Sequence, residues 1–171
     1  MKTFLKLTLA AAALLIVSGS TQASAQKFGY IDIQELVFSM PEIKEVEEKL
    51  QTLSTDLQNR LKIMEEEFTK KRTEYERSMS TMTEGVRQLQ EEELSRMMNN
   101  IQTFSQTAQT DIQNQQEKLL SPLFEKAQVA VNNVAVEQNL TAVFAAGALV
   151  YVNKDTMVDV LPLAKKRLGI E

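Results

Sequence analysis

The chain has 171 residues, of which 19 are lysine or arginine, 23 are aspartate or glutamate, and none is cysteine or histidine. No disulfide can form, and the commonest nucleophile, general base and zinc ligands are missing. We therefore expect no enzyme, no metal and no cofactor. The excess of acidic residues also argues against nucleic acid as a partner and allows at most weak or transient contact with a membrane.

The first 25 residues have the pattern of a secretory signal peptide. Lys2 and Lys6 precede an apolar segment, 7–17, and small residues ending in Ala-Ser-Ala follow it. A membrane anchor is the alternative, but the apolar segment is shorter than the ~20 residues that span a bilayer. We expect cleavage before Gln26 and export of the remaining chain, which carries 17 basic and 23 acidic residues because residues 1–25 hold two lysines and no acid.

The segment 27–37 contains KFGYIDI, in which Phe28 and Tyr30 alternate with Gly29 and Ile31. Alternation with aromatic and β-branched residues predicts a β-strand. Pro41 followed by Glu42 indicates that a helix starts there.

Two long stretches show the three- and four-residue spacing of apolar residues that is typical of helices. The first runs from Glu42 to about Arg77 and has an extra four-residue step near Leu57–Leu61, which unwinds a coiled coil locally. The second begins after Gly85 and runs to about Val136. The first series is Ile43, Val46, Leu50, Leu53, Leu57, Leu61, Met64, Phe68, Tyr75 and Met79, and the second is Val86, Leu89, Met97, Ile101, Phe104, Ala108, Ile112, Leu119, Leu123, Ala127, Val131 and Val134.

The stretch RSMSTMTEGVR at 77–87 separates the two helices and predicts a reversal of the chain. Its Ser and Thr residues are suited to capping free backbone groups, and Gly85 to a tight or left-handed position. Helices of about 55 and 75 Å do not fit inside a compact domain of this size, so we expect an antiparallel helical hairpin. Pro122 in the second helix requires a kink or an irregular turn.

The last part of the chain predicts short strands and one short helix. The apolar segments 140–147 and 148–153 indicate a β-hairpin, although a buried strand also fits such runs. Residues 159–168 predict a helix, with Pro162 near its start and Gly169 just after its end.

These elements define an α+β fold, mainly α. We expect a long antiparallel helical-hairpin (coiled-coil) arm, 42–136 with its tip near 78–85, projecting from a small β-strand body made of 26–41 and 137–171. Such a body has too few residues for a core of its own, so we expect oligomerisation. The residues assigned to the oligomerisation body are Phe28, Tyr30, Ile31, Val143, Phe144, Val150 and Val152.

The order of these elements, with the end segments KFGYIDIQELVFSMPE and NLTAVFAAGALVYVNKDTMVDVLPLAKKRLG, resembles the Skp/OmpH family of periplasmic chaperones. The resemblance implies a periplasmic homotrimer whose arms enclose a cavity. It also implies that the cavity holds unfolded outer-membrane β-barrel proteins without ATP and prevents their aggregation before membrane insertion. The alternative is a structural coiled-coil adaptor of the cell envelope that binds one fixed partner.

Methionine is suited to contacts with many different sequences because its thioether chain is flexible and polarizable. The candidate client-binding residues are Met64, Phe68, Tyr75, Met79, Met82, Met97 and Met98. The alternative is that these residues only pack one helix of the hairpin against the other.

The tip segment 70–87 carries a net charge of +2 and is a candidate basic surface for acidic clients or an anionic membrane. Its basic residues are Lys70, Lys71, Arg72, Arg77 and Arg87. The alternative is a solvated helix face with ion pairs such as Glu66–Lys70 and Glu67–Lys71.

Overall fold

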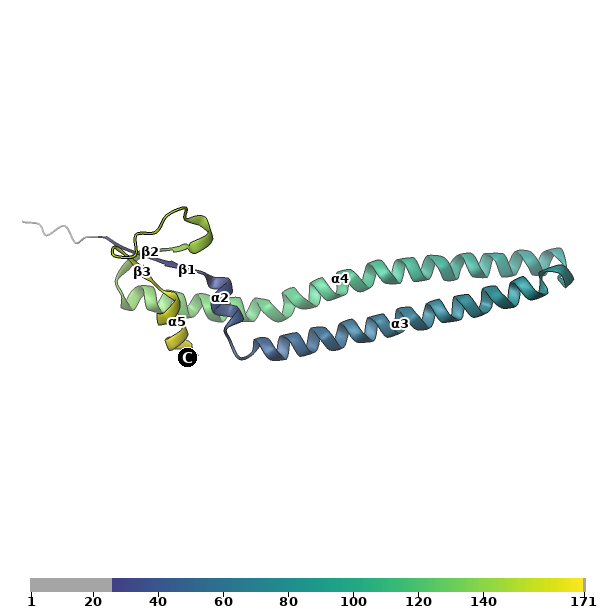
Figure 1. Cartoon of the computed structure of the whole chain (residues 1–171), viewed down its shortest axis with the longest axis horizontal. Helices are drawn as coiled ribbons and strands as arrows, with labels where there is room; N and C mark the ends of the chain where they lie inside the picture. The colour runs from purple at the N-terminus through teal and green to yellow at the C-terminus, as the bar shows by residue number, and fades with distance from the viewer. Residues whose placement is uncertain (1–25, 171) are drawn as a thin grey trace, which may run out of the picture.

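The protein, described here by a computed structural model of residues 26–170, is a long helical arm joined to a small body (Figure 1). Its elements in chain order are β1 (Lys27–Ile31), α2 (Ile33–Phe38), α3 (Ile43–Ser78), the 3-10 helix η1 (Met79–Thr81), α4 (Glu84–Glu137), β2 (Leu140–Ala145), the 3-10 helix η2 (Ala146–Ala148), β3 (Met157–Asp159) and α5 (Leu161–Leu168). The predicted signal peptide lies outside the described residues. Within residues 26–170, no helix combines the length and the apolar character needed to cross a membrane.

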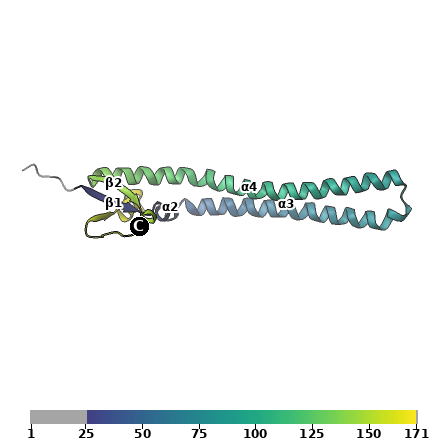
Figure 2. The same cartoon turned by 90° about the horizontal axis from the view of Figure 1, so that it is seen from above.

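The arm consists of α3 and the antiparallel part of α4, which lie side by side in both views (Figures 1 and 2). Helix α3 contains neither glycine nor proline and is rich in Glu, Lys, Gln and Leu, which are good helix formers. Ion pairs between residues one turn apart stabilise the helix further, as between Lys49 and Glu45 at 2.7 Å. The mainly helical fold with a small sheet confirms the predicted fold class at that level.

The chain reverses between Ser78 and Glu84, inside the segment where the sequence places the tip. The hydroxyl of Thr81 donates a hydrogen bond to the Ser78 carbonyl at 2.9 Å, which satisfies one free group at the end of α3. The role predicted for Gly85 is wrong. This glycine lies in the first turn of α4, and among the described residues only Asn139 and Gly169 have a positive φ.

Helix α4 continues through Pro122 without ending. Figure 1 shows that α4 is not straight, since its body end lies at an angle to the part that follows the arm. Pro122 is exposed, so water can reach the carbonyl that its missing N–H leaves without a partner. A bend inside one helix therefore takes the place of an irregular turn.

The sheet is parallel, with the order β2–β1–β3 and β1 in the centre. The predicted β-hairpin over 140–153 is therefore wrong. Strand β2 pairs with β1, whereas the segment 148–153 starts at the last residue of η2 and continues as a loop that contains Val150 and Val152. Both edge strands run in the same direction, so the chain after β2 must return to the start of the sheet before β3 can form.

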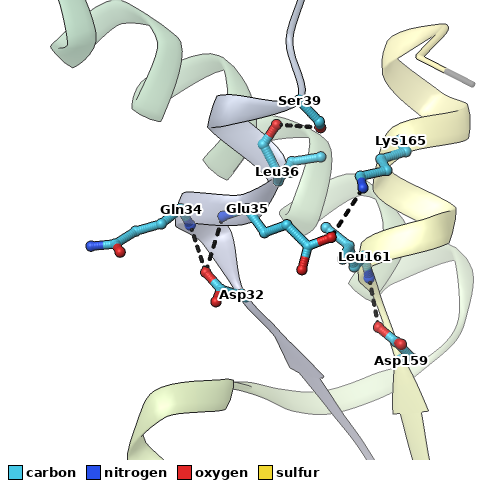
Figure 3. Close-up of polar contacts among 8 residues, drawn as sticks. All are labelled: Asp32, Gln34, Glu35, Leu36, Ser39, Asp159, Leu161 and Lys165. Atoms are coloured by element: carbon cyan, nitrogen blue, oxygen red, sulfur yellow. Dashed lines mark hydrogen bonds and ion pairs between the residues drawn. The ribbon is translucent and has the colours of Figure 1, made fainter.

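The strand predicted over 27–37 is wrong in its second half, which forms the short helix α2. Asp32 caps its start, because its carboxylate accepts hydrogen bonds from the backbone N–H groups of Gln34 at 3.0 Å and Glu35 at 3.1 Å (Figure 3). The strand consequently ends at Ile31. An Asp followed three residues later by Glu is a capping signal that the sequence contains but our prediction did not use.

The core of the body lies where α2, α5 and the end of α4 meet the sheet. Its buried residues are Ile31, Leu36, Val37, Met40, Ile43, Val46, Leu123, Ala127, Val131, Val134, Val160 and Ala164. Two ion pairs tie α5 in place, Lys165–Glu35 at 3.2 Å (Figure 3) and Arg167–Glu137. Helix α5 ends as predicted at Gly169, whose φ of 71° closes the last turn.

Replacing Gly29 with alanine should destabilise the body by about 1–3 kcal/mol, since overpacking a closely fitted strand has costs of that order. An added Cβ would lie 2.8 Å from Leu140 Cδ1 and from Val160 Cγ2. Urea unfolding measures the change. Gly85→Ala is the matched control, because no atom lies within 4 Å of its Cβ position and the helix there favours alanine. Equal unfolding midpoints for the two variants would contradict this expectation.

Candidate functional site

The two helices of the arm cover each other's apolar residues only in part. Leu57 is the last buried residue of α3, and Leu123 is the first buried residue of α4. In the described structure every residue from 58 to 122 is at least partly exposed. A partly exposed apolar strip therefore follows the arm along most of its length.

The methionines of the arm differ in exposure. Met79 is 46% exposed and Met98 is 52% exposed, whereas Met64, Met82 and Met97 are half-buried. Neighbouring residues of a helix point about 100° apart, so Met97 can be partly covered while Met98 faces outward. The half-buried set suits packing within the hairpin, and the exposed pair is free to contact another molecule.

The two aromatic candidates, Phe68 and Tyr75, are half-buried on α3. They contribute to the seam between the helices and still present part of their rings to solvent. Both roles that the sequence left open for them therefore fit their position.

Three exposed apolar residues of the arm were missed as candidates. Ile63 is 53% exposed, Val86 44% and Leu89 66%. The sequence assigned Val86 and Leu89 to the seam, which is wrong for Leu89. Ile63 was detectable, because it is an apolar residue outside the three-and-four spacing between Leu61 and Met64.

Polar contacts join the two helices in the outer half of the arm. Lys71 Nζ lies 3.1 Å from Glu93 Oε1, and the guanidinium of Arg60 lies 5.3 Å from the ring centre of Phe104. The Tyr75 hydroxyl donates a hydrogen bond to the Glu91 carboxylate. This part of the arm is therefore held by individual polar contacts as well as by apolar packing.

The hydrogen bond to Glu91, followed by burial, raises the pKa of Tyr75 above its ordinary value. A raised pKa in the folded state means that the contact stabilises the arm below the ordinary tyrosine pKa of about 10 and is lost as the pH rises through the folded value. We expect Glu91→Gln to lower the pKa of Tyr75, as measured by NMR titration of the tyrosine ring carbons. An unchanged pKa of Tyr75 in this variant would contradict the assignment.

The basic residues of the tip are partly paired with acids. Lys71 pairs with Glu93, Arg72 with Glu76 at 3.4 Å, and Arg87 with Glu84. Lys70 and Arg77 form no ion pair with any described residue. The suggested pairs Glu66–Lys70 and Glu67–Lys71 are not formed among the described residues. Glu66 pairs with Lys62 instead. Glu91 and Glu93 contact the outgoing helix at this level, so the tip has mixed charge.

The sheet of the body carries exposed apolar side chains on and beside strand β2. The rings of Phe28 and Phe144 lie 5.9 Å apart between centres, and Phe144 is 41% exposed. Burial, followed by the charge of Asp159, raises the pKa of Tyr30. Val143 and Val152 are half-buried, whereas Ile31 is 5% exposed and belongs to the core.

The loop after β2 is the most exposed apolar part of the body. Val150 is fully exposed, and Tyr151, which lies outside the predicted set, is 78% exposed. A groove beside β2, lined by Ile33, Val131, Ala135 and neighbouring residues, adds to this surface. Apolar surface thus gathers at one part of the body as well as along the arm.

One known protein family matches nearly all of the described chain. The family described as "Outer membrane protein (OmpH-like)" matches residues 27–168. The chain belongs to the OmpH-like family. The resemblance identified from the sequence is therefore confirmed, and the match includes β1, the whole arm and α5.

A solved structure supports the fold of this family member. It is the crystal structure of a candidate outer membrane chaperone (OmpH-like) from Caulobacter crescentus CB15, with a TM-score of 0.71. The two chains share 16% sequence identity, and the alignment covers 88% of each. No curated protein matches the sequence at a significant level. At this identity the likeness supports the arm-and-body fold and says nothing about individual side chains.

Proposed function

We propose that this chain is an ATP-independent periplasmic holdase that keeps unfolded outer-membrane β-barrel proteins from aggregating before they are inserted. Membership of the OmpH-like family and the description of the C. crescentus protein as a candidate outer membrane chaperone support a chaperone role. The proposed action is binding without catalysis or cofactor. The predicted export signal supports a periplasmic location.

The observation that carries the proposal is the incomplete burial along the arm from residue 58 to residue 122. A structural coiled coil buries its seam, whereas a holdase needs apolar surface that stays accessible and is weak at each single point. Met79 and Met98 supply flexible contacts of this kind, and Ile63 and Leu89 add larger apolar area. We propose these four residues as client contacts, with Met64, Phe68, Tyr75, Met82 and Met97 contributing their exposed parts.

We also propose that three chains assemble through the body so that their arms enclose one cavity. Phe144, Val150 and Tyr151 leave apolar surface in contact with water on an isolated body, and burying them between subunits would remove this surface from water. Phe28, Tyr30, Val143 and Val152 lie beside them and extend the contact, while Ile31 supports it from the core. Size exclusion with light scattering tests the assembly, and a stable folded monomer would refute it.

Lys70 and Arg77 are the proposed contacts for acidic segments of a client, because they are not engaged by any described acid. Such contacts are screened beyond about 8 Å at physiological salt, so they assist capture only at close range. Retention that falls moderately with salt is expected.

An aggregation assay tests the function directly. An outer-membrane β-barrel protein unfolded in urea is diluted into buffer with and without the purified protein, and light scattering is followed. Suppression for several unrelated barrels supports a holdase. Binding to one folded envelope protein, with no suppression, would favour the fixed-partner adaptor instead.

A further inference from the structure

Every sulfur atom within the described residues 26–170 belongs to methionine, because the sequence has no cysteine. Their exposure is graded. Met40 is 2% exposed in the body core, Met64, Met82, Met97 and Met157 are half-buried, and Met79 and Met98 are about half exposed on the outer arm. The sulfur atoms that solvent reaches most easily are thus those of the proposed client-binding strip.

Methionine is oxidised by peroxides in a two-electron step. A lone pair of the thioether sulfur attacks one oxygen of hydrogen peroxide, and the S–O bond forms as the O–O bond breaks. The proton of the attacked oxygen passes to the departing hydroxide, which leaves as water. The sulfide becomes a sulfoxide, which is polar and chiral, and methionine sulfoxide reductases reverse the change.

We propose that Met79 and Met98 are oxidation sites and that their conversion to the sulfoxide releases the arm from its clients. This inference rests on the proposed holdase function. The modification places a strongly polar oxygen in the strip that contacts apolar client segments, so those contacts lose their free-energy gain. Reduction of the sulfoxides restores capture.

The fold of the arm permits this modification. Both side chains are already half in water, so the added oxygens stay solvated and leave no polar group buried without a partner. Met40 is different, because an oxygen there would enter the closed core beside Leu36 and Val37. Oxidation of the outer methionines therefore changes the surface of the arm while the helices remain.

The experiment treats the purified protein with limiting hydrogen peroxide and follows each methionine by peptide mass spectrometry. We expect Met79 and Met98 to gain an oxygen first, the half-buried methionines later and Met40 last. Retention of an unfolded outer-membrane protein should fall about tenfold once both outer sites are oxidised. Circular dichroism should show unchanged helix content.

Two variants test whether oxidation of Met79 and Met98 causes the loss of client retention. Met79→Leu/Met98→Leu cannot be oxidised at these positions, so its retention after the treatment should equal its own retention before the treatment. Met64→Leu/Met97→Leu, the matched control, should lose the same fraction of its own untreated retention as the unmodified protein loses. Full retention after complete oxidation of Met79 and Met98, or equal rates at all methionines, would overturn the inference.

The order of oxidation is measured on the protein alone and does not depend on clients. If the untreated protein retains no unfolded barrel, the holdase proposal fails, and control by oxidation fails with it. If it retains clients but the oxidised form does so equally well, only the present inference fails.

Discussion

Replacing Ile63, Met79, Leu89 and Met98 together with serine should weaken retention of an unfolded outer-membrane protein about 100-fold while the arm stays folded. Each of these side chains is 46–66% exposed, so each keeps apolar area that a client can cover. Losing somewhat less than 1 kcal/mol of burial at each site amounts to about 3 kcal/mol, which is two orders of magnitude in affinity. Fluorescence titration with a labelled unfolded barrel measures the effect.

The control for this variant keeps the apolar surface and changes only its shape. Ile63→Leu, Met79→Leu, Leu89→Met and Met98→Leu together preserve volume closely and should retain clients within a few-fold. Circular dichroism is needed for both variants, because serine is a weaker helix former than the residues it replaces. If the serine variant binds normally, the exposed strip is not the client surface.

The helices of the arm were predictable from the sequence because their signal is long. Apolar residues spaced by three and four over the stretch from Ile43 to Met79 outweigh any single irregular residue, and the structure places α3 at Ile43–Ser78. The polar break at 77–87 located the turn for the same reason, since it is long enough to interrupt two such series.

Short apolar segments were harder to interpret because their structure depends on their neighbours. The segment Leu140–Ala145 is a strand and 149–153 is a loop, although both are rich in apolar and β-branched residues. What separates them is the pairing available at β1, whose two edges are occupied by β2 and β3. A tertiary restraint of this kind leaves no trace in local composition.

The sequence predicted which residue types the candidate site contains, but it predicted less well which of those residues are exposed. The methionines were identified by type, yet Met97 is half-buried and its neighbour Met98 is 52% exposed, because adjacent residues of a helix point in different directions. Leu89 fitted the three-residue spacing from Val86 but is 66% exposed. Near the end of a hairpin the partner helix covers less of the seam, and spacing alone cannot report that loss.

Leu36→Ala should unfold the body and with it abolish any assembly through the body. Leu36 is fully buried on α2, in the core formed with α4 and α5. Truncating a buried leucine costs about 2–5 kcal/mol, and a body of this size has a reserve of only about that magnitude. Urea unfolding followed by circular dichroism, with light scattering for the assembly state, measures both effects.

Gln34→Ala provides the matched control on the same short helix. Gln34 is exposed, and its bond to Asp32 uses the backbone N–H, which the substitution leaves in place. Its stability should change by no more than about 0.5 kcal/mol. The arm gives the decisive contrast, because only its body end, with Ile43, Val46 and Leu123, belongs to the core that contains Leu36. A variant that loses assembly yet keeps most of its helix content would show that the body, and not the arm, holds the subunits together; an assembly that survives Leu36→Ala would place the contacts along the arm.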